Sequence, residues 1–469
     1  MLFEEQLKLI KKNMSALLIS EVLTRLMMLV FTIILARAYG KEQFGLYALA
    51  LSIGGLFEII FNMGLNTVFL QRVIGEKKPL QEELSVFLPL RIILSVASYG
   101  CFVIFIFLMG KSPIALESLA LGGLYYTIAS IVGFLWACFD ARQKMQYTAG
   151  IKFFQYVIIF GLGMYFTLYN YPIGSIVGTY VISIVLAGIV TVVVINRYFS
   201  KIKSRVNITA WKAIIKSGWP IALSGTFVFM YNYLDTIIIS LNQGEQAVGL
   251  YQVSYKIIGS LFILSSLINQ AYFPSLIESH TQEKSKLITI FDKALKTVFF
   301  WSIPISVGGV MLGERIILFV FGPEYAAATT TFTILIWNCI IFFCSSAMAS
   351  LLYALGKQRQ TVKVFFIGAL VNTALNLYII PRYGIEGAAI TTILAEIAVL
   401  IGVYVQVKKE IDVNIFKSVL LPLFCSTIMA LALRFINFES LILMIAMGGA
   451  IYFATYFGIS FLNSRVLKK

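Results

Sequence analysis

The chain has 469 residues, of which 59% are hydrophobic and only 13% are charged, and its mean hydropathy is +0.89. Soluble globular chains average about 45–50% apolar and about 25% charged residues, so this composition excludes one large soluble domain and is typical of a chain whose solvent is mostly lipid. The formal charge of +15 does not indicate nucleic-acid binding, because the basic residues lie in short loops and no basic, aromatic-rich globular stretch is present.

Several kinds of catalytic and metal site are excluded by what the sequence lacks. The five cysteines lie inside apolar runs without metal-ligand spacing, and a single histidine, His280, allows no His cluster and no Ser-His-Asp triad. The sequence contains no P-loop, and no loop carries paired aspartates for a metal-dependent transfer of sugars. We therefore expect a protein that is not an enzyme, with no cofactor and no metal site.

Fourteen apolar runs are long enough to cross a bilayer, which requires about 20 residues per helix. The first run is too long for a cleavable signal peptide and is expected to be the first span. All should be helices, because lipid offers no hydrogen-bond partner to an open backbone. The predicted spans cover 14–39, 44–69, 86–108, 117–139, 147–168, 174–196, 217–241, 249–272, 294–313, 326–353, 361–380, 386–406, 417–436 and 439–462.

The distribution of basic residues predicts the orientation of these spans. If the N-terminus is cytoplasmic, 27 lysines and arginines fall in inner segments and five in outer ones, and the other five lie within spans. Inner loops of membrane proteins are enriched in this way, and an odd number of spans would disrupt the alternation. We therefore expect a multi-pass protein of the cell membrane with both termini in the cytoplasm.

A weak internal repeat predicts two related halves. Gly45-Leu46-Tyr47 and Gly249-Leu250-Tyr251 are 204 residues apart, and each opens an even-numbered span at its outer end. This predicts a parallel repeat of two six-helix bundles, 1–196 and 217–406, followed by two further helices in 407–469. The connecting segment 197–216 mixes basic residues with Trp211, and is either an interfacial amphipathic helix or a solvated linker.

Two pairs of opposite charges lie at matching depths in neighbouring predicted spans. Arg25 is fourteen residues before the outer end of the first span, and Glu58 is fourteen residues after the start of the second. Asp235 and Lys256 match in the same way in the seventh and eighth spans. Charges at such depths cost at least about 2.5–3.5 kcal/mol to insert, so each pair is either a structural salt bridge or part of a cavity lining.

Other polar residues within the spans have either a structural or a functional interpretation. Arg91 and Lys152 lie near the inner ends of their spans, where they either snorkel to the headgroups or line a cationic cavity mouth. Glu396 is in mid-span with no partner at equal depth, and faces neighbouring helices. Amides at i and i+4 share a helix face, so each of two pairs either points into a lumen or bonds between helices: Asn62 with Asn66, and Asn372 with Asn376.

Three turn sequences on the outer side carry a family resemblance: YGKEQFGLYALALS (39–52), FGPEYAAA (321–328) and IPRYGIEGAAITT (380–392). With ALGKQRQT (354–361) and fourteen spans, the chain from about residue 10 to 460 resembles the polysaccharide transporter branch of the multidrug/oligosaccharidyl-lipid/polysaccharide exporter superfamily, which includes O-antigen flippases. These motifs are typical of a fold and none is a catalytic signature.

The resemblance implies a V-shaped cavity between two helix bundles that rock in alternating access. It implies a polyprenyl-diphosphate-linked oligosaccharide as cargo, moved from the cytoplasmic to the outer leaflet, with polysaccharide polymerase and glycosyltransferases as partners. Arginine or lysine can replace the hydration of a diphosphate by charge-assisted hydrogen bonds. On this reading Arg25, Arg91, Lys152 and Lys256 are the candidate binding cations, and sugars meet Asn, Tyr and Trp groups such as Trp136.

Alternative functions remain open at this point. A cation-coupled multidrug or small-molecule antiporter would have the same fold, but its site should be dominated by carboxylates. Coupling to Na⁺ or H⁺ through Glu58, Asp235 or Glu396 is compatible with either transporter, as is direct action of the membrane potential on a positive cavity. A flippase for a peptidoglycan precursor belongs to the first class. A polymerase or ligase of surface sugars would need a large outer loop with catalytic residues, whereas the outer loops here are all short. A purely structural membrane scaffold is likewise not favoured.

Overall fold

The computed structural model describes residues 2–199, 204–282, 284–436 and 438–466, and within these ranges the regular structure is entirely helical. The linker residues Lys201 and Lys203 therefore lie outside the described residues. The elements are α1 (Leu2–Asn62), α2 (Leu65–Leu70), the π-helix η1 (Gln71–Gly75), α3 (Leu80–Leu108), α4 (Pro113–Ala141), α5 (Met145–Leu168), α6 (Ile173–Tyr198), α7 (Ile208–Gln282), α8 (Lys284–Phe321), the 3₁₀ helix η2 (Pro323–Tyr325), α9 (Ala328–Leu335), α10 (Asn338–Ala354), α11 (Gln358–Glu410), α12 (Ile415–Phe435) and α13 (Leu441–Val466).

Eleven stretches of the described chain are long and apolar enough to cross a membrane, and three of them contain two helical arms each. The arms of α1, α7 and α11 meet at Gly40, Gly244 and Gly384, where φ is 69°, 79° and 58°. Glycine adopts a positive φ more readily than other residues, so each of these three allows a sharp turn without an intervening loop. When each arm is counted separately, the eleven stretches contain fourteen helical segments, which agrees with the predicted number of spans. The predicted all-α membrane fold is confirmed.

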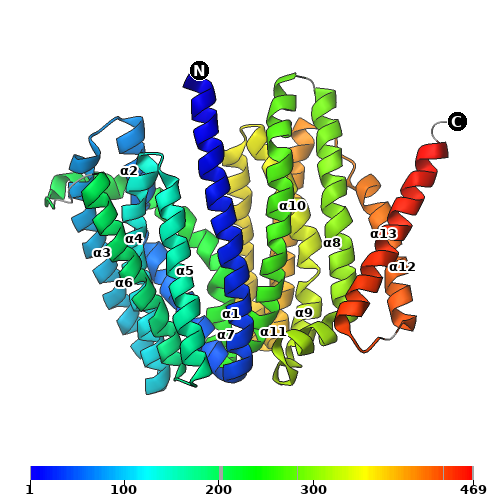
Figure 1. Ribbon diagram of the computed structural model, residues 1–469, viewed down its shortest axis with the longest axis horizontal. Coiled ribbons are helices and arrows are strands. Elements are labelled where there is room, and N and C mark those ends of the chain that lie inside the picture. The colour runs from blue at the N-terminus through cyan, green and yellow to red at the C-terminus, as the bar shows by residue number, and fades with distance from the viewer. Residues whose placement is uncertain (1, 200–203, 283, 437, 467–469) are drawn as a thin grey trace. The chain divides into compact units, whose positions relative to one another are not determined.

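The first of two compact units comprises Met1–Gly249. In it α4 is the central helix, because it contacts α1, α3, α5 and α6 (Figure 1). A buried aromatic cluster lies where α2, α3 and α4 meet, with the rings of Phe69, Phe87 and Phe134 5.2–6.2 Å apart. The start of α7 packs on this core through Trp211, whose indole Nε1 donates to the Val86 carbonyl at 2.9 Å, and through the fully buried Ile214.

The second unit comprises Leu250–Lys469 and holds α8 to α13 with the second arm of α7. Within it α10 packs on α8 and α11, while α12 packs on α8 and α13. The sequence predicted that the boundary between the two halves lies in the segment 197–216. The predicted domain limits, 1–196, 217–406 and 407–469, stay a prediction. Residues 208–216 form the first turns of α7, and whether they lie at a membrane interface is likewise still a prediction.

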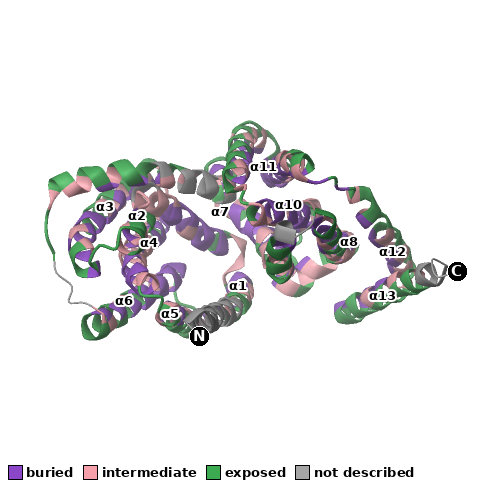
Figure 2. Ribbon diagram, turned by 90° about the horizontal axis from the view of Figure 1, so that it is seen from above, coloured by how far each residue is buried: buried purple, intermediate pink, exposed green. Residues whose placement is uncertain are grey.

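Large apolar side chains are exposed on the outward faces of the helices. Figure 2 shows long exposed stretches on α12 and α13, where Phe435 and Ile442 are 85% and 65% exposed (Figure 2). Soluble proteins rarely expose large contiguous apolar surfaces, whereas a helix that faces lipid must do so. The exposed faces therefore agree with a chain surrounded by hydrocarbon.

The second predicted span is not one continuous helix. It was expected to run over 44–69, but the helix ends at Asn62 and α2 starts at Leu65, with positive φ at Met63 and Gly64. The break occurs where another backbone approaches closely, because a Cβ built on Gly218 in α7 would lie 2.0 Å from the Met63 carbonyl oxygen. Packing against α7 therefore interrupts a segment whose apolar pattern alone predicts an unbroken span.

The two glycines of the repeated motif contact each other's hairpin. A Cβ on Gly45 would lie 1.8 Å from the carbonyl oxygen of Glu245, and a Cβ on Gly249 would lie 2.0 Å from that of Lys41. Each glycine thus meets the residue four positions before its counterpart, so the contact is reciprocal, as expected for two hairpins related by a pseudo-twofold axis. Only small residues permit backbones to approach this closely in a membrane protein.

We expect Gly45→Ala to lower the thermal stability of the purified protein by about 1–3 kcal/mol, because the added methyl group meets backbone atoms that cannot rotate away. Gly161→Ala in α5 is the matched control, since a Cβ there meets nothing within 4 Å. The control should be neutral or slightly stabilising because alanine favours helix. Unfolding followed by intrinsic fluorescence in detergent measures both, and equal midpoints would show that the close crossing does not constrain the fold.

Candidate functional site

A buried ion pair joins three helices of the first unit. Arg91 on α3 is 1% exposed, and its Nη2 lies 3.0 Å from Oε1 of Glu58 on the second arm of α1. The Arg91 Nε donates to the Ser130 carbonyl on α4 at 3.0 Å, and its Nη1 donates to the Asn62 carbonyl at 3.2 Å. Every nitrogen of the guanidinium therefore has an acceptor, which is the condition for keeping a cation inside a membrane protein.

Small hydroxyl groups complete the polar cluster around this pair. The hydroxyls of Ser95 and Ser130 lie 2.7 Å apart, and Ser98 donates to the Phe57 carbonyl at 3.0 Å. A cavity of about 10 Å³ lies among these side chains, which is close to the space occupied by one water molecule. The cluster is too closed to bind a cargo in this conformation, and it holds α1, α3 and α4 in register.

This pairing corrects the prediction made from matching depths. Glu58 pairs with Arg91 and not with Arg25, whose side chain is exposed on the first arm of α1. One reason is that α3 begins at Leu80, six residues earlier than the predicted span, so Arg91 lies deeper than the sequence suggested. Arg91 therefore neither snorkels to the headgroups nor lines an open mouth here.

Lys152 on α5 is placed by an aromatic side chain of α4. Its Nζ lies 5.2 Å from the centre of the Trp136 ring, and the indole Nε1 of Trp136 donates to the Thr191 hydroxyl at 3.0 Å. A cation over the face of tryptophan is attracted to the ring by about 0.5–2 kcal/mol. Because Lys152 is exposed, it keeps hydrogen-bonding capacity for a ligand.

The second predicted charge pair lies on the two arms of α7. Asp235 is buried, and its Oδ1 accepts from the backbone N–H of Thr236 at 2.7 Å and from the hydroxyl of that residue at 3.3 Å. Lys256 is exposed. The two residues belong to different units of the fold, so an ion pair between them stays a prediction.

Several polar side chains of the second unit bond to one another. Glu396, which had no evident partner in the sequence, accepts from the Ser345 hydroxyl of α10 at 2.5 Å. The Asn376 amide donates to Oδ1 of Asn372 at 2.9 Å and accepts from the Thr391 hydroxyl on the second arm of α11. The Asn372–Asn376 bond thus lies within the first arm of α11, and the bond between Asn376 and Thr391 joins its two arms.

The first amide pair does not share a helix face as predicted. The chain breaks between Asn62 and Asn66, so the i, i+4 relation of a continuous helix does not apply. Asn62 instead donates to Glu58 at 3.1 Å, and Asn66 lies 3.5 Å from the Gly133 carbonyl. Among the described residues, no group of three or more His, Cys, Asp or Glu side chains is arranged to hold a metal ion.

A surface ion pair that sequence reasoning missed lies at one end of the first unit. We call this the turn end, because the chain reverses there at Gly40, Gly110, Asn170 and Gly244. The Lys111 Nζ lies 2.8 Å from Glu245 Oε1 and 3.3 Å from the Ser240 hydroxyl. It thus links the α3–α4 turn to the α7 hairpin beside the Gly45–Gly249 contact. Nothing in the spacing of these residues along the chain indicates the link.

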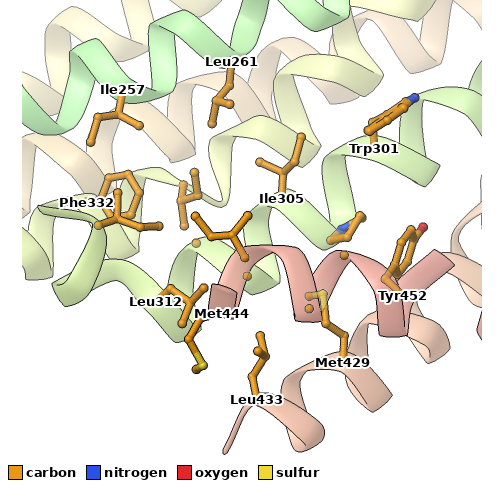
Figure 3. A pocket seen from close by; sticks show the side chains of 18 of the residues that line it. Ile257, Leu261, Trp301, Ile305, Leu312, Phe332, Met429, Leu433, Met444 and Tyr452 are labelled. Carbon is orange, nitrogen blue, oxygen red and sulfur yellow. The ribbon is translucent and has the colours of Figure 1, made fainter. Parts of the chain in front are cut away.

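The second unit contains an apolar groove that the sequence also did not reveal. Its volume is about 380 Å³, and it lies between α8, α12 and α13, with Ile257 and Leu261 of α7 and Phe332 of α9 on its far wall (Figure 3). Trp301 and Tyr452 stand at one end, where the Tyr452 hydroxyl donates to the Phe300 carbonyl at 2.8 Å. With that hydroxyl already bonded, the groove suits a flexible hydrocarbon ligand.

We expect Arg91→Ala to destabilise the protein strongly, because removing one partner of a buried ion pair leaves an unpaired charge that costs about 3–5 kcal/mol. The double variant Arg91→Met with Glu58→Leu removes both charges and should recover most of the lost stability. Membrane abundance and the thermal midpoint in detergent measure the effect. If the double variant is as unstable as the single one, the hydrogen bonds to Ser130 and Asn62, not the charge balance, hold the three helices.

Comparison with known proteins places the chain in a sequence family. The profile of the family described as "Polysaccharide biosynthesis protein" matches residues 10–280, and a second profile, MatE, matches residues 220–378. A capsular polysaccharide biosynthesis protein, CapF, of Staphylococcus aureus is 22% identical over 85% of this chain and 99% of its own length. A putative O-antigen transporter of Shigella flexneri is 24% identical over 76% of this chain and 88% of its own length.

Solved structures with the same fold are membrane transporters. The lipid II flippase MurJ in an inward closed conformation superposes with a TM-score of 0.80 at 16% identity, covering 97% of this chain and 99% of that structure. An inward-facing multidrug resistance transporter of the MATE family superposes with a TM-score of 0.63 at 15% identity, covering 82% and 95%. The fold is therefore that of a multi-pass membrane transporter, and the chain belongs to the polysaccharide biosynthesis protein family.

Proposed function

We propose that the protein is a flippase that moves a polyprenyl-diphosphate-linked oligosaccharide from the cytoplasmic to the outer leaflet of the cell membrane. The observation that carries the proposal is that one membrane-embedded chain has exposed cations within its spans and, separately, an apolar groove of about 380 Å³. A cargo with an anionic head and a long hydrocarbon tail needs both kinds of environment. The protein would thereby act between the glycosyltransferases that build the cargo and the polymerase that uses it.

The exposed cations would bind the diphosphate. Arg25 lies deep in the first arm of α1 and is exposed, and Lys152 is exposed beside Trp136. A diphosphate loses its hydration when it enters hydrocarbon, and a guanidinium compensates through short, paired hydrogen bonds. Arg91 does not take this role in the present conformation because its donors are occupied by Glu58, Ser130 and Asn62.

The apolar groove would hold the first isoprene units of the tail. Its walls come from Leu312, Met429 and Leu433 among others, and methionine adapts its shape to irregular apolar ligands. The remainder of a long tail can stay in lipid, so the groove needs to hold only part of it. In this proposal the contact between Gly45 and Gly249 closes the turn end, which the distribution of basic residues predicts to be outside, and its separation would open the outward-facing state.

The antiporter alternative receives less support from the charges. A site for cationic drugs needs available carboxylates, but Glu58 is paired with Arg91, and Glu396 is bonded to Ser345. Asp235 and Glu396 remain candidates for Na⁺ or H⁺ coupling within the proposed flippase. The membrane potential acting on a positively charged cavity would be a second source of energy.

We expect Arg25→Ala to reduce flipping by about tenfold to a hundredfold, which is the value of one or two hydrogen bonds to a charged group. Arg25→Lys should retain part of the activity, because lysine keeps the charge but not the paired donors. The measurement uses proteoliposomes with a fluorescent polyprenyl-diphosphate-linked N-acetylglucosamine and records the fraction that becomes accessible outside. Arg197→Ala, at the exposed end of α6, is the control. Unchanged flipping in Arg25→Ala would remove this residue from the mechanism.

We expect Gly449→Phe to slow the transport of long-chain cargo, because the ring would fill the groove that Gly449 lines. A Cβ at this position comes within 4.0 Å only of Phe453, so the backbone need not move. A cargo analogue with a farnesyl tail should be affected much less than one with a long polyprenyl tail. Gly458→Phe, on the same helix and away from the groove, is the matched control. Equal slowing of both cargo lengths would show that the groove does not hold the tail.

A further inference from the structure

A polar basin at the turn end of the first unit is distinct from the ion pair and from the apolar groove. Its volume is about 800 Å³, within the usual range of sites for small molecules. Four separate segments form its walls: residues 38–46 of α1, the α3–α4 turn, the α5–α6 turn and Glu245 of α7. No single helix end accounts for it, because residues far apart in the sequence converge on one hollow.

Several side chains in the basin have hydrogen-bonding groups available for a ligand. Glu42, Gln43 and Asn170 are exposed and line it. Within the part of the chain that the structure describes, the side chains of these three residues have no hydrogen-bond or ion-pair partner. They supply a carboxylate and two amides, which can both donate to and accept from vicinal hydroxyl groups.

Two tyrosines give the basin a fixed aromatic wall. The Tyr39 hydroxyl donates to the Tyr171 carbonyl at 2.6 Å, which ties the α1 turn to the α5–α6 turn. The Tyr171 ring packs against Phe166 with the ring centres 4.9 Å apart. A tyrosine ring offers an apolar face together with a polar edge, so it suits a ligand that has both C–H and O–H surfaces.

The charge balance of the basin argues against the diphosphate as its ligand. Glu42 and Glu245 are acidic, and Lys111, the basic residue of the lining, is already paired with Glu245 at 2.8 Å. Like charges disfavour binding, so an anionic group is repelled, while a neutral or amino-bearing ligand is accepted. The combination of amides, carboxylates and tyrosine faces, with a net negative charge, fits a neutral or amino-substituted saccharide.

We propose that this basin is a saccharide-binding site that receives the sugar part of the cargo on the outer side of the membrane. The inference rests on the proposed flippase function and on the orientation expected from the basic residues. The basin adjoins the Lys111–Glu245 ion pair and the hairpin crossing of Gly45 and Gly249. A sugar bound here occupies the region where the outward-facing state opens.

The test measures protection of a cysteine placed in the basin. Ala38 is exposed and lines the basin, so Ala38→Cys is introduced together with Cys101→Ser, which removes the exposed native thiol. Right-side-out membrane vesicles are labelled with a membrane-impermeant maleimide, with and without a soluble oligosaccharide. The probes are N-acetylchitotriose, which is neutral, its deacetylated form, which is cationic, and a hyaluronan tetrasaccharide, which is anionic. Glu439→Cys, in the α12–α13 turn, is the labelling control.

We expect the neutral and cationic sugars to slow labelling of the Ala38→Cys variant, the anionic sugar to have no effect on it, and labelling of the Glu439→Cys control to be unchanged. Glu42→Gln and Gln43→Ala should weaken protection by about tenfold, the value of one strong hydrogen bond. Glu76→Gln, an exposed glutamate of the loop before α3, should leave protection unchanged. The proposal would be overturned if neither the neutral nor the cationic sugar protected the cysteine, or if the lining variants did not weaken the protection.

Flipping of the lipid-linked probe is measured in the same variants, so that the two hypotheses fail separately. Flipping without saccharide protection would reject the basin and leave the flippase function intact. Saccharide protection without flipping would reject the transport function while supporting a carbohydrate site. Protection by a free sugar but not by the sugar of the lipid-linked probe would show that the basin binds a soluble saccharide and not the cargo, which contradicts the proposal.

Discussion

A cation inside hydrocarbon must be surrounded by acceptors, and this constraint organises the first unit. Arg91 satisfies it by bonding to α1 through Glu58 and the Asn62 carbonyl, and to α4 through the Ser130 carbonyl. The bonds therefore hold three helices at fixed rotations about their axes, which apolar contacts alone specify poorly. Because hydrophobic association does not drive helices together within lipid, such polar contacts and close packing of small residues carry much of the specificity of the fold.

The same constraint separates buried structural charges from exposed ones. Arg91 and Glu396 are buried, and Arg25, Lys152 and Lys256 are exposed. The apolar groove follows the opposite rule, since its lining is almost entirely apolar and its one hydroxyl, at Tyr452, is bonded to the backbone. In the proposed flippase, charged head, apolar tail and saccharide would thus meet three different surfaces of this chain.

Counting residues along the chain predicted the number of spans, because hydropathy acts along the membrane normal. Residue counting did not predict that Glu58 pairs with Arg91. A pairing also depends on how each helix is rotated about its axis, which the depth of a residue does not specify. Residue counting also missed the break at Met63 and Gly64, which depends on contact with Gly218 of α7. The basin and the groove depend on residues from several helices, so no local pattern indicates either one.

The structure gives a physical reason for the repeated Gly-Leu-Tyr motif, which is only a weak repeat in the sequence. A glycine is needed at position 45 because the Glu245 carbonyl occupies the space of a side chain, and a glycine is needed at 249 because the Lys41 carbonyl does so. One close crossing therefore constrains both copies at once, with the offset of 204 residues preserved. The nearest atoms to the Cβ position of each glycine belong to the opposite backbone, so a larger residue at either position would force the two hairpins apart. In the proposed flippase, this reciprocal glycine crossing is the point at which the two hairpins would separate in the outward-facing state.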